Sequence, residues 1–207
     1  MIVKQVELSD ILVTNAYFYI DETTKHGFLI DPGAEAEKLL AIIEDNGWTI
    51  EKILLTHGHF DHIGAVEEIY RALKVPYFAH PKAQAYLTDS QLNLSAYFGN
   101  PIILNNAQYI TDHNVMLSSN PEVKLEVIST PGHTQDAVVY YDAANHIAFV
   151  GDTIFKNSIG ATHFPGGDMS QLLQSIKQKV LTLPDDTVLY SGHSESTTVA
   201  AEKKNFS

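Results

Sequence analysis

Seven residues of this 207-residue sequence carry side chains that bind metal ions, and their order suggests one shared centre. They are His57, His59, Asp61, His62, His133, Asp152 and His193. The first four form a compact run that reads His-x-His-x-Asp-His, and each of the others follows an apolar run typical of a buried strand. Imidazole and carboxylate groups suit Zn²⁺, Fe²⁺ and Mn²⁺. Seven such ligands are enough for two divalent ions that share one carboxylate, and such a pair can activate water for hydrolysis.

The spacing within the compact run favours two ions over one. His57 and His59 are two residues apart and Asp61 and His62 are adjacent, so a single ion cannot easily take all four from so short a loop. Gly58 gives the turn the freedom to divide them between neighbouring ions. The lone histidines His26, His80, His113 and His146 are interpreted as ordinary surface or core residues. Asp31, which follows a strand, is either a group that orients a ligand imidazole or an acid that stabilises a turn.

Apolar periodicity and turn residues predict the elements that must position these ligands. Strands are expected at residues 3–8, 16–20, 27–31, 53–55, 75–79, 123–129, 137–142, 147–150 and 187–190. Helices are expected at residues 35–46, from 61 onward, at 81–87, after Asp168 and from Ser194. Asp168 is the expected N-cap of its helix, with Gln171 at the third helical position. The ligands are therefore expected at the ends of four strands, because rigid strands can hold metal ligands in accurate positions.

The order of these elements predicts an α/β (α+β) architecture of two mixed β-sheets packed together, with helices outside. Two neighbouring strands form the expected antiparallel hairpin around Ala144 and Asn145. No linker or tandem repeat interrupts the sequence, so residues 1–207 are expected to form a single domain. Residues 93–109 are interpreted as a surface excursion that shapes a substrate pocket.

Composition narrows the possible partners. The formal net charge is −12, and Arg71 is the only arginine. Because no cluster of Lys and Arg offsets that charge, nucleic acid is not an expected partner. The absence of cysteine excludes disulfides, iron–sulfur clusters, thiolate zinc sites and a cysteine nucleophile. No apolar run approaches the length of a membrane span, so we expect no membrane partner and a cytoplasmic location; the oligomeric state stays open.

The motifs resemble those of the metallo-β-lactamase superfamily, in particular its small glyoxalase II-like (hydroxyacylglutathione hydrolase-like) branch. The resemblance spans nearly the whole chain and rests on segments 30–33, 56–62, 130–134, 151–155 and 191–193. It implies an αβ/βα four-layer sandwich with the metal site at one edge, between the two sheets.

The resemblance also assigns roles within the site. It implies that His57, His59 and His133 hold one ion, that Asp61, His62 and His193 hold the other, and that Asp152 bridges them. Two Zn²⁺ ions are expected, with Fe²⁺ or Mn²⁺ as alternatives. A metal-bridging hydroxide, oriented by Asp61 as the catalytic residue, would hydrolyse a small thioester such as a glutathione conjugate.

Three other functions stay open at this point. The first is a persulfide dioxygenase with one iron on His57, His133 and Asp152; the second is a lactonase; the third is a non-enzymatic scaffold. The chain also departs from its relatives, which usually carry arginine and aspartate where this sequence has Ala161 and His163. His163 is therefore either a substrate contact or a structural loop residue, and the substrate is less well defined than the metal chemistry.

Overall fold

The computed structural model describes residues 1–110 and 113–206 of the chain. The strands are β1 (Ile2–Ser9), β2 (Val13–Ile20), β3 (His26–Ile30), β4 (Thr49–Leu54), β5 (Tyr77–Ala79), β6 (Gln108–Tyr109), β7 (Asn114–Met116), β8 (Lys124–Ser129), β9 (Val138–Asp142), β10 (Ile147–Gly151), β11 (Ile154–Phe155), β12 (Ser158–Ile159), β13 (Val188–Ser191) and β14 (Thr197–Thr198). The helices are α1 (Ala36–Asn46), α2 (Phe60–Ile63), α3 (Val66–Leu73), α4 (Ala83–Leu87), α5 (Met169–Ser175) and α6 (Val199–Lys203), with short helical turns η1 (Ser95–Tyr97) and η2 (Ile176–Val180).

Most strands form two six-stranded sheets, and both sheets are mixed. The first has the order β1-β2-β3-β4-β5-β6, antiparallel from β1 to β3 and parallel from β3 to β6. The second has the order β14-β13-β10-β9-β8-β7, in which only β10 and β13 run parallel. The predicted hairpin between β9 and β10 is confirmed.

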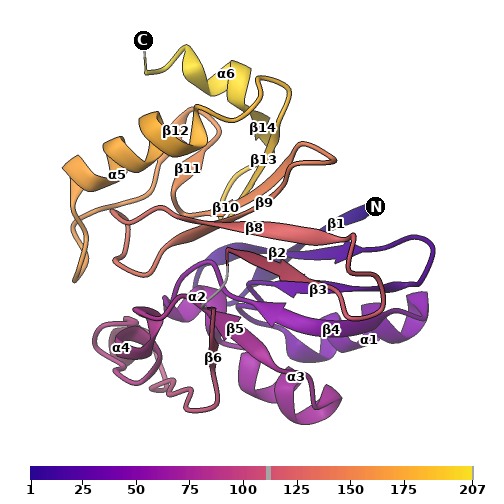
Figure 1. Ribbon diagram of the computed structural model, residues 1–207. Helices are drawn as coiled ribbons and strands as arrows, with labels where there is room; N and C mark the ends of the chain where they lie inside the picture. The colour runs from indigo at the N-terminus through magenta and orange to yellow at the C-terminus, as the bar shows by residue number, and fades with distance from the viewer. Residues whose placement is uncertain (111–112, 207) are drawn as a thin grey trace.

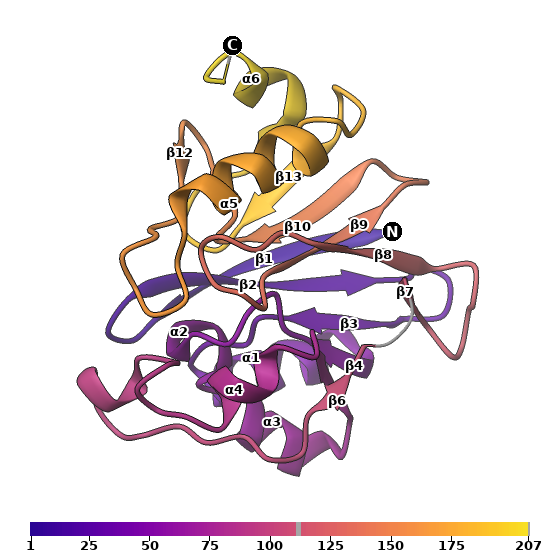
Figure 2. The same ribbon diagram turned by 60° about the vertical axis from the view of Figure 1, so that its left-hand side comes forward.

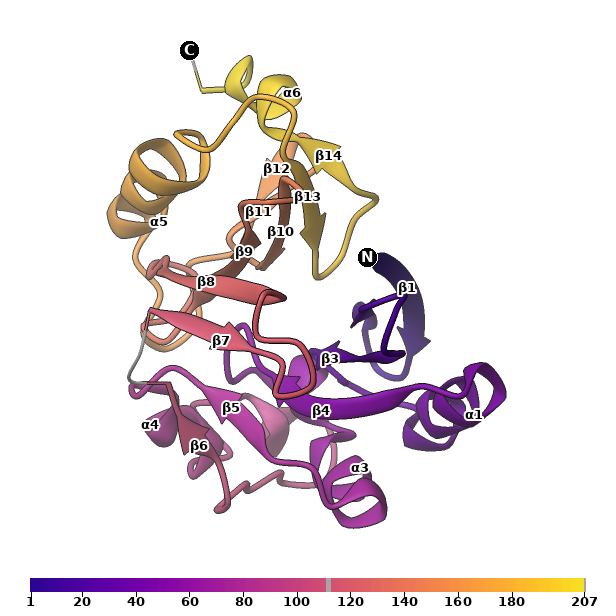
Figure 3. The ribbon, with the colours of Figure 1, turned by 45° about the vertical axis from the view of Figure 1, so that its right-hand side comes forward.

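The two sheets stack face to face and each is covered by helices on its outer side (Figure 1). Helices α1 and α3 lie against the first sheet, and α5 and α6 lie on the far side of the second, as Figure 3 shows from another side. Three separate apolar cores fill the spaces between these four layers. The predicted α/β sandwich of two mixed sheets is therefore confirmed.

Side chains that alternate along the strands give each sheet an apolar surface on both faces. On β2, Phe18 and Ile20 pack toward α1 and α3, whereas Tyr17 and Tyr19 pack between the sheets. On β9, Tyr140 points between the sheets and Tyr141 points toward α5. Because successive strand residues face opposite sides, apolar runs of this kind are expected of strands that are buried on both faces.

The end of α1 and the start of α5 follow the sequence signals. Gly47, with φ of 62°, ends α1 in the left-handed conformation that glycine adopts without strain. Asp168 caps α5, since its side chain accepts a hydrogen bond from the backbone N–H of Gln171, as predicted. Leu172, Ile176 and Val180 are buried by α5 and η2 against the second sheet.

Two helix predictions were wrong in their extent. The helix expected from Asp61 onward is broken into α2 and α3, because the backbone N–H of Ala65 bonds to the carbonyl of Pro32 instead of continuing the helix. The C-terminal helix begins at Val199 rather than Ser194. Residues Thr197–Thr198 pair first as β14 with β13, and Thr198 then caps α6.

The two sheets come together at the end of the molecule where α2 lies (Figure 2). The loops that follow their strands also meet at this edge. Strands β4, β8, β10 and β13 all end there, and each is followed within four residues by a predicted ligand. Within residues 1–110 and 113–206, no helix combines the length and apolar character needed to cross a bilayer.

Candidate metal centre

The fold brings the seven predicted ligands into three overlapping clusters. These are His57, His59 and His133; His57, His62 and Asp152; and Asp61, His62 and His193. Within each cluster the candidate ligand atoms all lie within 4.8 Å of one another. The shared members join the clusters into one centre, as the strand-end argument requires.

The spacing of the donor atoms fits ions with tetrahedral coordination. Two donors about 2.05 Å from a tetrahedral ion lie roughly 3.3 Å apart. The Nε2 atom of His193 is 3.1 Å from Oδ2 of Asp61 and 3.2 Å from Oδ2 of Asp152. His133 Nε2 lies 2.9 Å from Nδ1 of His59 and 3.5 Å from Oδ2 of Asp152. The residues present therefore fit a pair of divalent ions.

Four of the five imidazoles aim Nε2 at the centre because an oxygen atom holds Nδ1. His133 donates its Nδ1–H to the carbonyl of Ala161 at 2.6 Å, and His193 donates to the carbonyl of Val13 at 2.7 Å. His62 donates to a carboxylate oxygen of Asp31 at 2.9 Å. A histidine held in this way keeps a free lone pair on the other nitrogen, which is how proteins orient metal ligands.

Asp31 joins two of these ligands through Thr56. One Asp31 oxygen accepts from the backbone N–H of Thr56 at 2.7 Å, and the other accepts from its hydroxyl at 2.6 Å. The hydroxyl of Thr56 also lies 3.1 Å from Nδ1 of His57, which donates to it. Asp31 thus contacts His62 directly and His57 through one hydroxyl. This geometry favours the orienting role over that of a simple turn acid.

Several buried polar atoms at the centre make no hydrogen bond among the described residues, although Nε2 of His62 and Oδ1 of Asp152 lie 3.4 Å apart. They include Nε2 of His57 and of His62 and Oδ1 of Asp152. A buried polar atom without a hydrogen bond is costly and uncommon, so three of them facing one point indicate a missing ligand. A metal ion satisfies all three by accepting their lone pairs.

Burial and charge divide the imidazoles into two groups. Burial and the neighbouring imidazoles hold the pKa of His57 well below its usual value, and lower the pKa of His59 to about 3. Burial opposes protonation of His62 and His193, but adjacent carboxylates outweigh it, so the pKa of His62 rises well above its usual value and that of His193 rises to about 10. At neutral pH the first group is ready to bind metal, whereas protons compete with metal at the second.

The two carboxylates face both groups of histidines. Burial disfavours ionised Asp152, but His62 and His193 outweigh it and hold its pKa well below the usual range. Oδ1 of Asp152 lies 3.4 Å from His62, and Oδ2 lies near both His133 and His193. Asp152 thus lies among His62, His133 and His193, and its bridging role stays a prediction. Asp61 accepts a hydrogen bond from the hydroxyl of Thr14 at 3.1 Å.

A cavity of about 220 Å³ opens directly onto the centre. Five of the residues that line it are predicted ligands, and the other seven are apolar: Leu12, Phe60, Leu94, Phe98, Phe155, Ala161 and Phe164. Phe60 and Phe98 stack at 5.0 Å between ring centres. The cavity wall away from the ligands is therefore apolar throughout its described residues.

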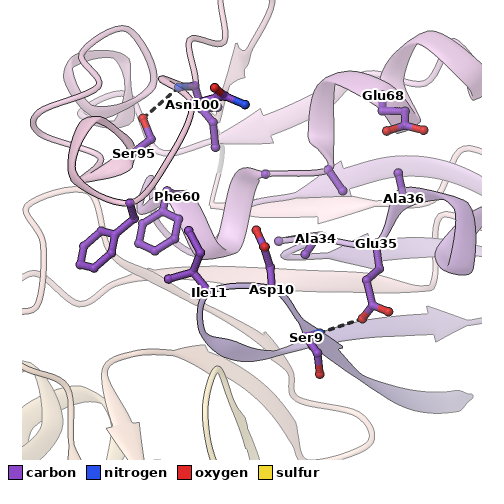
Figure 4. A pocket seen from close by; sticks show the side chains of 15 residues that line it. Ser9, Asp10, Ile11, Ala34, Glu35, Ala36, Phe60, Glu68, Ser95 and Asn100 are labelled. Atoms are coloured by element: carbon purple, nitrogen blue, oxygen red, sulfur yellow. Dashed lines mark hydrogen bonds between the residues drawn. The ribbon is translucent and has the colours of Figure 1, made fainter.

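A second cavity, of about 400 Å³, lies behind Phe60 and shares Phe60 and Phe98 with the first. Figure 4 shows Phe60 and Ile11 close together at one end of it and Glu35 and Glu68 toward the other. None of the predicted ligands lines it. Its larger volume therefore does not make it the site of the metal chemistry.

His163 lies outside the centre. Its side chain is exposed, its ring lies 4.1 Å from that of Phe164, and it does not line the metal cavity. Ala161 does line the cavity and also supplies the carbonyl that holds His133. The predicted substrate contact by His163 stays a prediction, and the contact that the structure shows is with Phe164.

Sequence reasoning missed several residues that support the ligands. Thr14 and the carbonyl of Val13 come from the start of β2, far from His193 in the sequence, and no local pattern links them. Asp136 is buried against the ligand loop, and burial raises the pKa of its carboxyl to about 6. Its position three residues after His133 was the only available signal.

Comparison with known proteins agrees with this geometry. The sequence model of the metallo-beta-lactamase superfamily matches residues 10–193. The chain belongs to the metallo-beta-lactamase superfamily. Among curated relatives, the probable metallo-hydrolase YqgX of Bacillus subtilis is 37% identical over 91% of this chain and 89% of its own length. The hydroxyacylglutathione hydrolase GloC of Haemophilus influenzae is 33% identical over 87% of this chain and 86% of its own.

Solved structures of the superfamily share the whole fold. The BLEG-1 B3 metallo-beta-lactamase superposes with a TM-score of 0.91 at 36% identity, covering 98% of this chain and 97% of that one. TTHA1623, solved in a di-iron-bound form, superposes with a TM-score of 0.86 at 33% identity, covering 98% of each chain. The predicted family is confirmed: the chain is a metallo-hydrolase of this superfamily, with the three clusters as its candidate metal-binding site.

Proposed function

We propose that this protein is a binuclear metal-dependent thioester hydrolase of the glyoxalase II type. The observation that carries the proposal is the pair of ligand groups, one on each side of Asp152, with donor spacings that fit two ions. When bound, such ions supply Lewis-acid catalysis and lower the pKa of water toward ~7. Zn²⁺ is the proposed metal, and the likeness to a di-iron-bound structure supports Fe²⁺ as an alternative.

The side chains of the site give a thioester what its hydrolysis needs. Asp61 has one carboxylate oxygen held by Thr14 and His193, so it can accept a hydrogen bond from the attacking water and orient it. The departing thiolate needs little help from an acid, because a thiol pKa near ~8.5 makes it a fair leaving group. A cavity whose described wall, apart from the predicted ligands, has no side chain that could act as a general acid therefore still suits thioester cleavage.

The test is hydrolysis of a thioester panel by protein with measured metal content, including S-D-lactoylglutathione. We expect turnover that requires two ions per chain. Replacement of Asp61 by Asn should lower kcat by at least tenfold, while Asp45→Asn, at an exposed position on α1, should leave it unchanged. If fully loaded protein cleaves no thioester, the proposal is rejected.

The same samples distinguish the other candidate reactions. A lactone panel tests the lactonase reaction. Oxygen uptake with a persulfide substrate and one iron per chain would support the dioxygenase reaction instead. The dioxygenase triad of His57, His133 and Asp152 lies within the same centre as the other four ligands. Retention of all seven ligands in one place favours the two-ion hydrolase.

A further inference from the structure

The residues that line the metal cavity limit which features of a substrate the protein can recognise. Every described residue that lines it is either a predicted ligand or an apolar side chain. Phe60 and Leu94 are buried in the wall, and Leu12 and Phe98 form its more exposed rim. Beyond the ligands, side chains in this cavity can contribute apolar contact but no charge and no hydrogen bond.

The cavity is also small. Its volume is about 220 Å³. Pockets that enclose drug-sized ligands usually have ~300–1,000 Å³. The cavity is therefore suited to the acyl group of a thioester, whereas a whole glutathione conjugate must extend beyond it.

The surroundings of the cavity do not favour the carboxylates of glutathione. The neighbouring cavity behind Phe60 carries the side chains of Asp10, Glu35 and Glu68. Lys156 follows Phe155 on the other side, but its ammonium group is 2.5 Å from a carboxylate oxygen of Glu195. Neither the metal cavity nor the cavity behind Phe60 has a cationic side chain other than the ligand histidines among the described residues of its wall, so neither offers a lysine or arginine partner to the carboxylates of an anionic thiol.

We propose that the preferred substrate is a thioester with an apolar acyl group seated against Phe60, Phe98, Phe155 and Phe164, and that the protein does not recognise the carboxylates of the thiol. This inference rests on the proposed thioester hydrolase function. It makes Phe98 and Leu12, at the rim, the residues that determine specificity. Aromatic walls of this kind bind alkyl and aryl groups by burial of their surface.

The first experiment compares four substrates on metal-loaded protein: the lactoyl and hexanoyl thioesters of glutathione and of N-acetylcysteamine, which is uncharged. We expect the acyl group to dominate, with kcat/KM rising about fourfold for each methylene buried until the cavity is full. We expect the two thiols to differ by less than about threefold for the same acyl group. Preference for lactoylglutathione over both hexanoyl thioesters overturns the inference and leaves the hydrolase function standing.

The second experiment measures binding without turnover, by calorimetry with the thioethers S-methyl- and S-hexyl-N-acetylcysteamine. The hexyl compound should bind at least tenfold more tightly than the methyl compound. Phe98→Ala should reduce this ratio, and Ile103→Ala should not, because Ile103 is exposed but lies outside the cavity wall. Equal binding of the two thioethers contradicts the inference even if no thioester were cleaved.

A gain-of-function variant completes the test. Leu12 and Ile103 are exposed to nearly the same extent, at 44% and 43%. Leu12→Lys places a cation at the rim and should raise kcat/KM for the glutathione thioesters about two- to fivefold, without raising it for the uncharged ones. Ile103→Lys makes the same change in net charge away from the rim and should leave the ratio between the two thiols unchanged. Equal effects of both lysines would show that only net charge matters and would refute the role of Leu12.

Discussion

Asp31 offers the sharpest test of how the protein holds its metal ligands. We predict that Asp31→Asn weakens metal binding at the group formed by Asp61, His62 and His193 by about 10- to 100-fold. The substitution preserves the shape of the side chain. It also suits the backbone, because Asp31 has φ of 50° and asparagine tolerates this left-handed conformation better than most residues.

The magnitude follows from the three hydrogen bonds that Asp31 accepts. An asparagine can keep its oxygen toward His62 and the hydroxyl of Thr56, but its amide group then faces the backbone N–H of Thr56. That arrangement leaves one buried donor without an acceptor, which costs about 1–3 kcal/mol. It also removes the charge that strengthens the bond to His62. The unpaired donor lowers the unfolding free energy with or without metal, whereas the weakened bond to His62 lowers metal affinity, by the roughly 10- to 100-fold typical of partners that orient metal ligands.

The assay is competition with a chromophoric chelator, together with metal content by mass spectrometry. Asp186→Asn is the matched control, because Asp186 also accepts from a histidine, His146, at 2.8 Å but does so on the surface. An exposed pair of this kind contributes about 0–1 kcal/mol and holds no predicted ligand. If Asp31 were only a turn acid, Asp31→Asn would change the unfolding free energy and leave both metal affinities as in the natural protein; that result would refute the orienting role.

Four further predictions concern protons, backbone contact and the support beneath the ligand loop. In protein stripped of metal, the pKa of His193 is raised to about 10. The stability that protonated His193 contributes is therefore fully present below about pH 6.5 and is lost as the pH rises toward 10. Chemical denaturation across this pH range should show the loss of stability in chelated protein and not in metal-loaded protein. Because adjacent carboxylates raise the pKa of His62 and His193, loading with Zn²⁺ at pH 7.5 should release protons, which calorimetry in buffers of different ionisation enthalpy would count; release of none would contradict the prediction. Gly33→Ala should disrupt the metal site, because a Cβ at that position would lie 1.6 Å from the carbonyl oxygen of Asp61, whereas Gly47→Ala meets no atom within 4 Å and should bind metal normally despite a backbone cost of about 1 kcal/mol. Tyr140→Phe removes the buried bond to the carbonyl of Leu55, at 2.8 Å, and should lower the unfolding free energy by about 1–2 kcal/mol, while Tyr97→Phe on the surface should have no measurable effect.

The sequence was sufficient to predict the strands that end in ligands, because a short apolar run lies in each of them shortly before the ligand. The runs before His57, His133, Asp152 and His193 needed no tertiary information to be recognised. Small residues near these ends were expected to allow close approach. Gly192 shows the reason, since a Cβ there would lie 2.2 Å from Oδ1 of Asp152. The apolar runs and the small residues near their ends were therefore enough to predict which strands end at the centre and which ligands they bring there.

The rest of the site depends on contacts that local pattern does not encode. The carbonyl of Val13 holds His193 across 180 positions of sequence, and backbone carbonyls carry no residue-specific signal. Strands β11, β12 and β14 have two residues each, which is too short for an alternating pattern to be detected. The break between α2 and α3 arises from a hydrogen bond to Pro32, so helical periodicity alone predicts one continuous helix there.

The buried charges of the centre show why this fold does not have to depend on metal in order to form. Asp31, Asp61 and Asp152 lie together with little exposure to solvent, and three uncompensated carboxylates there would be strongly destabilising. The raised pKa of His62 and His193 favours their protonated forms when metal is absent, and these offset part of the negative charge. Metal loading is then an exchange of protons for cations within a preformed frame, and three apolar cores hold that frame together. Small zinc domains differ, because their few core residues leave folding dependent on the ion itself.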